Sequence, residues 1–206
     1  RRTVCISSQV GCPLACSFCA TGNRGFTRNL TRGEIIEQVI QSAALLKANQ
    51  LTLANVVFMG MGEPFHNYQA VMDAIKILND PRGLGFGARR FTISTAGLVP
   101  EINRFTAERS QVNLAISLHA ADDELRSSLM PVNRRYPISV LLEACGRYIK
   151  TSKRRVSIEW ALIEGINDSL DQANKLVSLI KGQLYHVNLI QLNPVDHYRG
   201  APAGDD

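Results

Sequence analysis

Three cysteines occupy one short stretch of the chain, "GCPLACSFCA" at residues 11–20. Cys12, Cys16 and Cys19 follow the spacing C-x3-C-x2-C, and an aromatic residue, Phe18, directly precedes the last of them. Disulfides use thiols in pairs, and structural zinc takes four ligands, whereas the nearest histidine, His66, lies far along the chain. Three thiolates can instead hold three irons of a [4Fe–4S] cluster and leave the fourth iron open. The spacing favours such a cluster over a zinc site.

Other residues that could bind a ligand or take part in catalysis lie in short segments that each follow an apolar run. The segments are "GMGEP" (60–64), "STAG" (94–97), "SLHA" (117–120), "EGIND" (164–168) and "NPVDH" (193–197). Gly62 permits close backbone approach to a ligand, and Glu63 can accept hydrogen bonds from an ammonium group. Each residue also has a plainer interpretation: Glu63 as a helix-start carboxylate, His119 as a core histidine, and Asn193 as a turn residue before proline.

The elements that must position these segments alternate along the chain. Apolar runs predict strands at 2–8, 53–61, 89–95, 112–118, 155–163 and 185–192. Amphipathic periodicity predicts helices at 31–48, 68–78, 99–108, 122–130, 138–150 and 169–181, the first with a Thr31–Glu34 capping box. Six β/α units predict an α/β fold with a parallel sheet, in a single domain over residues 1–206. Chemistry then belongs at the carboxyl ends of the strands.

The amino-acid composition indicates an ordinary globular protein. The 206 residues are 45% hydrophobic and 20% charged, as in an ordinary globular protein, and no apolar run reaches the ~20 residues of a membrane span. Five cysteines, three of them clustered, make a poor disulfide framework and fit a cytoplasmic protein better. The net charge of +5 and basic stretches around Arg24, Arg28 and Arg32 suggest a polyanionic partner such as RNA, although these arginines also fit solvated surface charge.

Taken together, the motifs carry a resemblance to a known family. "CISSQVGCPLACSFCATG", "MGMGEP", "STAGLVP", "AISLHA", "PVNRRY" and "NLIQLNP", ordered from Cys5 to Pro194, resemble the radical S-adenosylmethionine (SAM) methyltransferases that modify one adenosine in 23S ribosomal RNA. The resemblance implies a partial (β/α)6 TIM-like barrel and a [4Fe–4S] cluster held by Cys12, Cys16 and Cys19, whose open iron binds SAM. It implies SAM contacts at Gly62, Glu63, Ser94, Ser117, Leu118, His119 and Asn193.

The same resemblance assigns a catalytic role to Cys5, whose plainer interpretation is a buried strand cysteine. In the family, the cysteine at this place releases RNA from a covalent protein–RNA intermediate. A second cysteine near the family's C-terminus carries the methyl group, and we expect it, with the N-terminal accessory domain, to lie outside this sequence. The chain is then expected to cleave SAM without completing methylation alone. Cys145 falls at an apolar helical position, which predicts a core residue.

Several interpretations stay open at the level of sequence. The quoted motifs are shared by the branch that methylates C2 of adenosine in 23S ribosomal RNA and by the antibiotic-resistance branch that acts at C8. We favour C2 because that branch is the more widespread, and transfer RNA stays open as a second substrate. A glycyl-radical activating enzyme fits the cysteines but not the later motifs. A zinc or RNA-binding module without catalysis is the third alternative. The family implies an electron donor such as flavodoxin or ferredoxin, and we expect a monomer without membrane contact.

Overall fold

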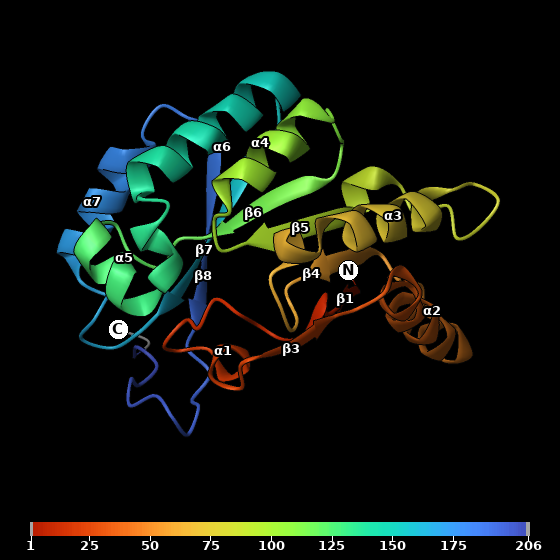
Figure 1. The fold of residues 1–206 in the computed structure, drawn as a ribbon, viewed down its shortest axis with the longest axis horizontal. Helices are drawn as coiled ribbons and strands as arrows, with labels where there is room; N and C mark the ends of the chain where they lie inside the picture. The colour runs from red at the N-terminus through yellow and green to blue at the C-terminus, as the bar shows by residue number, and fades with distance from the viewer. Residues whose placement is uncertain (1, 205–206) are drawn as a thin grey trace.

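The computed structural model describes residues 2–204 and contains a curled parallel sheet (Figure 1). The sheet has six strands in the order β1-β4-β5-β6-β7-β8, and every neighbouring pair is parallel. The strands are β1 Thr3–Cys5, β4 Asn55–Phe58, β5 Phe91–Thr95, β6 Asn113–Ser117, β7 Val156–Leu162 and β8 Tyr185–Gln191. This half-barrel confirms the predicted α/β class and the partial barrel.

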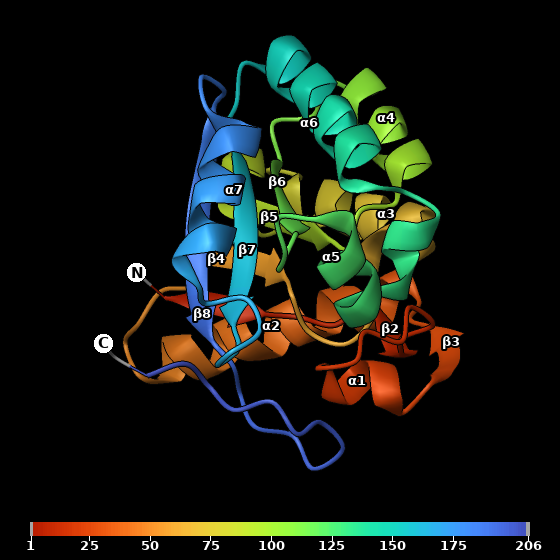
Figure 2. The same cartoon turned by 90° about the vertical axis from the view of Figure 1, so that its left-hand side faces the viewer.

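The longer helices cover the outer face of the sheet, as the two views at right angles show (Figures 1 and 2). They are α2 Arg32–Ala48, α3 Tyr68–Asn79, α4 Val99–Ala107, α5 Asp123–Leu129, α6 Ile138–Ser152 and α7 Leu170–Ile180. The predicted capping box is present: the Thr31 hydroxyl accepts from the Glu34 amide, and the Glu34 carboxylate accepts from the Thr31 amide. Short 3-10 turns lie at Pro64–Asn67, Ala88–Arg90 and Pro131–Arg134.

The structure adds elements within the cysteine segment that the sequence patterns did not predict. β2 Gln9–Gly11 and β3 Phe26–Asn29 form an antiparallel pair, and α1 Ala20–Asn23 lies between them in sequence. The predicted first strand is correspondingly shorter, because the chain leaves the sheet after Cys5. The cysteines therefore lie in a connection bounded by a hairpin, on the side of the molecule where α1 appears in Figure 2.

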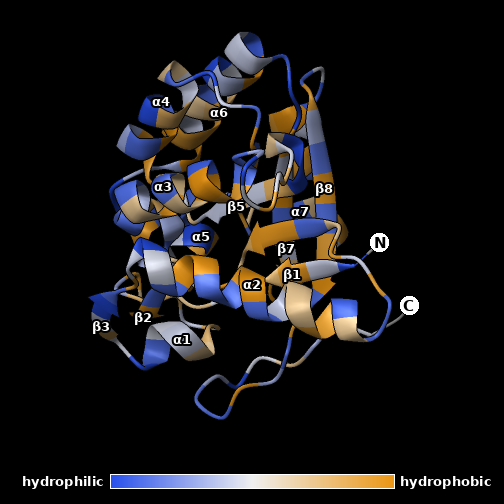
Figure 3. Cartoon of the chain, turned by 90° about the vertical axis from the view of Figure 1, so that its right-hand side faces the viewer, coloured by the Kyte–Doolittle hydropathy of each residue, from blue (hydrophilic) through white to orange (hydrophobic). Residues whose placement is uncertain are grey.

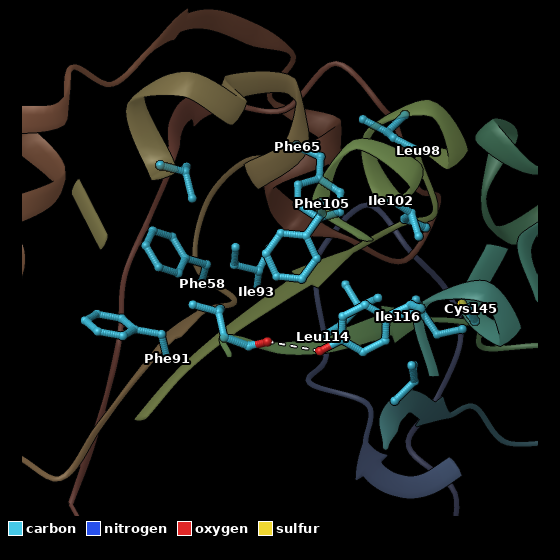
Figure 4. Packing of buried hydrophobic residues seen from close by; sticks show 14 of the residues in the cluster. Phe58, Phe65, Phe91, Ile93, Leu98, Ile102, Phe105, Leu114, Ile116 and Cys145 are labelled. Atoms are coloured by element: carbon cyan, nitrogen blue, oxygen red, sulfur yellow. Dashed lines mark hydrogen bonds between the residues drawn. The ribbon is translucent and has the colours of Figure 1, made fainter. Parts of the chain in front are cut away.

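The main core lies between the sheet and the outer helices. Figure 4 shows Phe65 and Phe105 side by side above Ile93, and their ring centroids are 5.8 Å apart. Cys145 is fully buried in this core, as predicted. In the hydropathy view (Figure 3), β7 is largely apolar, as expected for a strand covered by helices, whereas the edge strand β8 is mixed and mostly exposed.

A second, smaller apolar cluster lies at the carboxyl ends of the strands. Its buried members are Ala96, Ala120, Leu129, Met130, Ile163 and Leu192. Cys16 and Phe18 pack against it, so this cluster supports the cysteine segment. No helix among residues 2–204 is long and apolar enough to cross a membrane.

Candidate functional site

A cavity of about 240 Å³ lies at the carboxyl ends of the strands. Eight of the residues singled out from the sequence line it: Cys12, Cys16, Cys19, Gly62, Glu63, Ser94, Ser117 and His119. They come from the cysteine segment and from the connections after β4, β5 and β6. Segments far apart in sequence thus converge where a parallel sheet is expected to hold its ligands.

Backbone hydrogen bonds hold the cysteine segment to the hairpin and to α5. The Cys12 amide donates to the Gly25 carbonyl across the hairpin (2.9 Å), and the Cys19 amide donates to the Cys16 carbonyl (3.2 Å). Between the last two cysteines, the Ser17 amide donates to the Leu129 carbonyl at the end of α5 (2.9 Å). The loop is therefore held from two sides, by the hairpin and by α5.

The three thiols are disposed around the cavity and do not meet at one point. No three histidine, cysteine or acidic side chains in residues 2–204 are gathered closely enough to hold a single metal ion. Zinc needs its ligands to share one atom, whereas an iron–sulfur cluster gives each thiolate its own iron. Burial raises the pKa of the Cys12 thiol and raises that of Cys16 to about 12, so metal binding must displace protons from them.

Glu63 combines the two roles that the sequence left open. It precedes the Pro64–Asn67 turn, and its Oε1 accepts from the Phe65 amide at 3.0 Å, as a cap does. Its Oε2 accepts from the Ala96 amide at 2.8 Å, which ties the connection after β4 to the one after β5. Burial raises the pKa of Glu63 to about 7. A cation entering the cavity would favour its ionised form.

Gly62 lines the cavity, but it must be glycine because the backbone there packs directly against Gln9. Its φ is +101°, and a Cβ there would lie 2.5 Å from the Cβ of Gln9 on β2. The Gln9 side chain accepts from the Glu63 amide (2.8 Å) and donates to Asn29 Oδ1 on β3 (2.7 Å). The hairpin is thus packed against the segment that carries Glu63, a contact that the sequence did not predict.

His119 is held in one tautomer. The Ala161 amide donates to His119 Nδ1 at 2.8 Å, which places the proton of the neutral ring on Nε2. Burial, with a smaller contribution from Arg126, lowers the pKa of His119 to about 3. The ring packs edge-on against Phe18, with centroids 4.9 Å apart. His119 therefore offers the cavity a neutral N–H donor beside the cysteine segment.

Three predicted site residues lie apart from the cavity lining. The Leu118 side chain is fully buried in the main core, its amide donates to the Glu159 carbonyl (3.1 Å), and its carbonyl accepts from Arg126 Nε (3.1 Å). Asn193 is exposed after the end of β8. Cys5 is exposed at the end of β1, and partial desolvation still raises the pKa of its thiol, against the opposing effect of the Met59 backbone. The buried strand cysteine, the plainer interpretation of Cys5, is wrong.

The cavity also contains residues that the sequence analysis passed over. Glu159, in the middle of β7, lines it and accepts a hydrogen bond from Asn188 on β8 at 2.7 Å. A single acidic residue inside the apolar run "RVSIEWALI" was the available signal. Met130, after α5, lines the cavity too. Arg126, on the same helix, is fully buried next to it, and its position three residues before Leu129 puts both on the buried face.

Known proteins resemble this chain in sequence. Residues 6–177 match the family model of the radical SAM superfamily. Proteins named probable dual-specificity RNA methyltransferase RlmN are similar: that of Frankia alni is 51% identical over 99% of this chain, and that of Heliobacterium modesticaldum is 53% identical over 95%. The aligned region makes up 51% of each relative, so the chain spans about half the length of the proteins it matches.

A solved structure resembles the fold and the sequence together. It is a radical SAM methyltransferase from Sphaerobacter thermophilus, 53% identical, with a TM-score of 0.97 over 98% of this chain and 60% of that one. The half-barrel, the cysteine spacing and the family match over residues 6–177 agree with one another. The chain belongs to the radical SAM superfamily.

Proposed function

We propose that this chain is the catalytic barrel of an RNA methyltransferase that methylates C2 of an adenosine in 23S ribosomal RNA and in transfer RNA. The observation that carries the proposal is the convergence of three thiols with Glu63 and His119 on one cavity. The names of the relatives, which are dual-specificity RNA methyltransferases, supply the substrate class. The C2 position rests on the family resemblance.

Cys12, Cys16 and Cys19 are the residues that would hold a [4Fe–4S] cluster. Their separate positions around the cavity suit a group with several metal atoms. When bound, the cluster supplies the electron for reductive cleavage of SAM. The remaining polar groups of the cavity would bind and orient SAM beside it.

The chain's own groups fit the parts of SAM. The buried Glu63 carboxylate would accept from the ammonium group, and that charge would in turn favour the ionised form of Glu63. The neutral His119 ring would donate its Nε2 proton to an acceptor of the ligand. Ser94 and Ser117 line the same cavity and can donate or accept with their hydroxyls. The Leu118 backbone and Asn193 complete the proposed contacts.

Cys5 would act on the RNA and not on SAM. It is exposed and lies outside the cavity lining, so a macromolecular substrate can reach it. By family resemblance, its thiolate would break the covalent link between the protein and the methylated base. The raised pKa of the Cys5 thiol means that a base must take its proton before it can attack. The cysteine that forms the link would come from outside residues 1–206.

The basic residues near the cysteine segment divide into two groups. Arg28 forms two hydrogen bonds with the Glu34 carboxylate, at 2.9 and 2.7 Å, and is committed to the start of α2. No ion pair within residues 2–204 engages Arg24 or Arg32. We assign phosphate contact to Arg24 and Arg32. We further propose a cytoplasmic monomer that receives electrons from a flavodoxin or a ferredoxin.

The first experiment asks whether the chain binds the cluster and cleaves SAM. After anaerobic reconstitution with iron and sulfide, we expect about four irons and four sulfides per chain and, with SAM and dithionite, formation of 5′-deoxyadenosine. C16A should lose both iron and product. The matched control C145A removes a buried thiol of the main core and should retain them. One zinc per chain and no deoxyadenosine would contradict the proposal and favour a binding module.

The second experiment addresses the position of methylation. The full-length protein that carries this barrel would be reduced anaerobically with SAM and protein-free 23S ribosomal RNA or transfer RNA, and the nucleosides would be analysed by mass spectrometry. We expect 2-methyladenosine from both RNAs. 8-Methyladenosine would assign the protein to the C8 branch instead.

A further inference from the structure

Arg126 carries a buried positive charge that has no role in the proposed binding and cleavage of SAM. Its side chain, on α5, has no exposed surface and is the largest of the fully buried side chains. Burying a guanidinium costs several kcal/mol unless other groups compensate for the lost hydration. No ion pair among residues 2–204 involves Arg126; the Asp123 carboxylate on the same helix favours its charge from beyond ion-pair distance.

Neutral acceptors take the place of water around this guanidinium. Nε donates to the Leu118 carbonyl (3.1 Å), and Nη1 donates to Asn133 Oδ1 (2.8 Å). Nη2 donates to the carbonyls of Ala96 (2.7 Å) and Ser117 (3.0 Å). These dipoles solvate the positive charge without cancelling it. Burial lowers the pKa of Arg126 only to about 10, so the group stays cationic at neutral pH.

The partners of Arg126 place its charge directly behind the cavity. Ala96 and Ser117, which accept from Nη2, both line the cavity together with the three cysteines. The carbonyl of Leu129, one helical turn beyond Arg126, holds the cysteine segment at Ser17. Cys16 packs on the same cluster as Leu129, which brings this proposed metal ligand close to α5 and Arg126.

We propose that Arg126 is the buried counter-charge of the metal site and raises the reduction potential of the cluster held by Cys12, Cys16 and Cys19. This rests on the cluster assignment proposed above. Reduction adds one electron, supplied by a low-potential donor, and makes the cluster more negative by one charge without taking up a proton. A fixed positive charge in a low-dielectric wall stabilises that reduced form. By holding the carbonyls of Ala96 and Ser117, Arg126 is also a positioning residue for the site.

The test is a redox titration of the reconstituted chain, followed by the electron paramagnetic resonance signal of the reduced cluster. R126Q removes the charge, and R126K keeps it while losing the fork of hydrogen bonds. At the potential that half-reduces the wild type, we expect the ratio of reduced to oxidised cluster to fall about tenfold in R126Q. R126K should stay close to the wild type. R147Q, at an exposed arginine paired with Glu143 on α6, is the matched control and should not change the ratio.

A second pair of variants keeps Arg126 in place, in case R126Q does not fold. The Ser127 hydroxyl accepts at 2.9 Å from the Asn133 amide, and the same Asn133 side chain accepts from Arg126. S127D adds a negative charge beside this network, whereas S127N does not. We expect S127D to lower the reduced-to-oxidised ratio and S127N to leave it unchanged.

The outcomes separate the two proposals. Wild-type protein without about four irons per chain would overturn the cluster assignment itself. A wild-type cluster whose potential is unchanged in R126Q and in S127D would overturn the role of Arg126 alone. Equal shifts in R126Q and R126K would also overturn it, since they would show that packing and not charge sets the potential.

Discussion

At the scale of single residues, burial acts on Glu63 and His119 in opposite directions with the same result. It raises the pKa of the carboxyl to about 7 and lowers that of the imidazole to about 3. Both shifts favour the neutral form, because a low-dielectric cavity penalises any isolated charge. Each side chain is oriented by backbone amides, from Ala96 and from Ala161. A charged ligand that enters the cavity would therefore change the protonation equilibria of these side chains.

The first prediction concerns the protonation of His119. We expect its ring to remain neutral, with the proton on Nε2, from pH 8 down to pH 5 in the folded, ligand-free chain. The unfolded chain takes up a proton near the ordinary pKa of 6.5. The folded state is therefore destabilised as the pH falls below 6.5 towards 3. Long-range ¹⁵N NMR of the ring nitrogens measures the tautomer directly, and a midpoint near 6.5 for His119 would contradict the assignment.

At the scale of elements, the periodicity of apolar residues predicted the parallel sheet and its helices but did not predict the β2–β3 hairpin. The six strands of the sheet lie within apolar runs of sequence and the helices after them have amphipathic patterns, as at β6 and α6, so these patterns identify them. β2 and β3 have three and four residues, and every residue of β3 is exposed, so neither shows an apolar pattern. Their pairing depends on tertiary contacts, such as the hydrogen bond from Gln9 to Asn29.

Prediction of the site was also limited, because some of its residues are brought together only by tertiary contacts. The cysteines, Glu63 and His119 could be found because strand ends converge in a parallel sheet. Arg126 could not, since its role depends on which side chains of α5 are buried behind the cavity, and the signal for Glu159 was only a single acidic residue in an apolar run. The exposure of Cys5, which excludes its interpretation as a buried strand cysteine, goes with the early end of β1.

The second prediction tests the contact between the hairpin and the connection after β4. G62A places a methyl group 2.5 Å from Gln9 Cβ at a φ of +101°. We expect it to lower the free energy of unfolding by about 3 kcal/mol or more, through clash and backbone strain together. G85A is the matched control, because its φ is +59° and no atom lies within 4 Å of the added methyl. It should cost about 1 kcal/mol from the conformation alone.

Urea unfolding of the two variants measures this difference. If G62A costs no more than G85A, the packing of Gln9 against Gly62 does not stabilise the hairpin.

At the scale of the whole molecule, the site is supported by much less apolar burial than the barrel. The main core extends through the sheet and the outer helices, whereas the cluster beneath the cavity has few buried members, among them Leu129 and Met130. The hairpin and α1 add little, because β3 is exposed and α1 is only four residues long. Regions with few buried contacts open at a smaller free-energy cost than the core.

The third prediction follows from this uneven support. In the metal-free chain, we expect backbone amides of residues 20–29 to exchange with deuterium much faster than those of β5 and β6. Loading the three cysteines with iron and sulfide should slow exchange at 20–29, because the cluster binds only the closed arrangement of the thiols and so stabilises it. β5 and β6 should exchange slowly in both states and serve as the internal control. Equal protection of residues 20–29 with and without iron would mean that the apolar cluster alone holds the cysteine segment closed, and that the metal site is fully formed before any metal arrives.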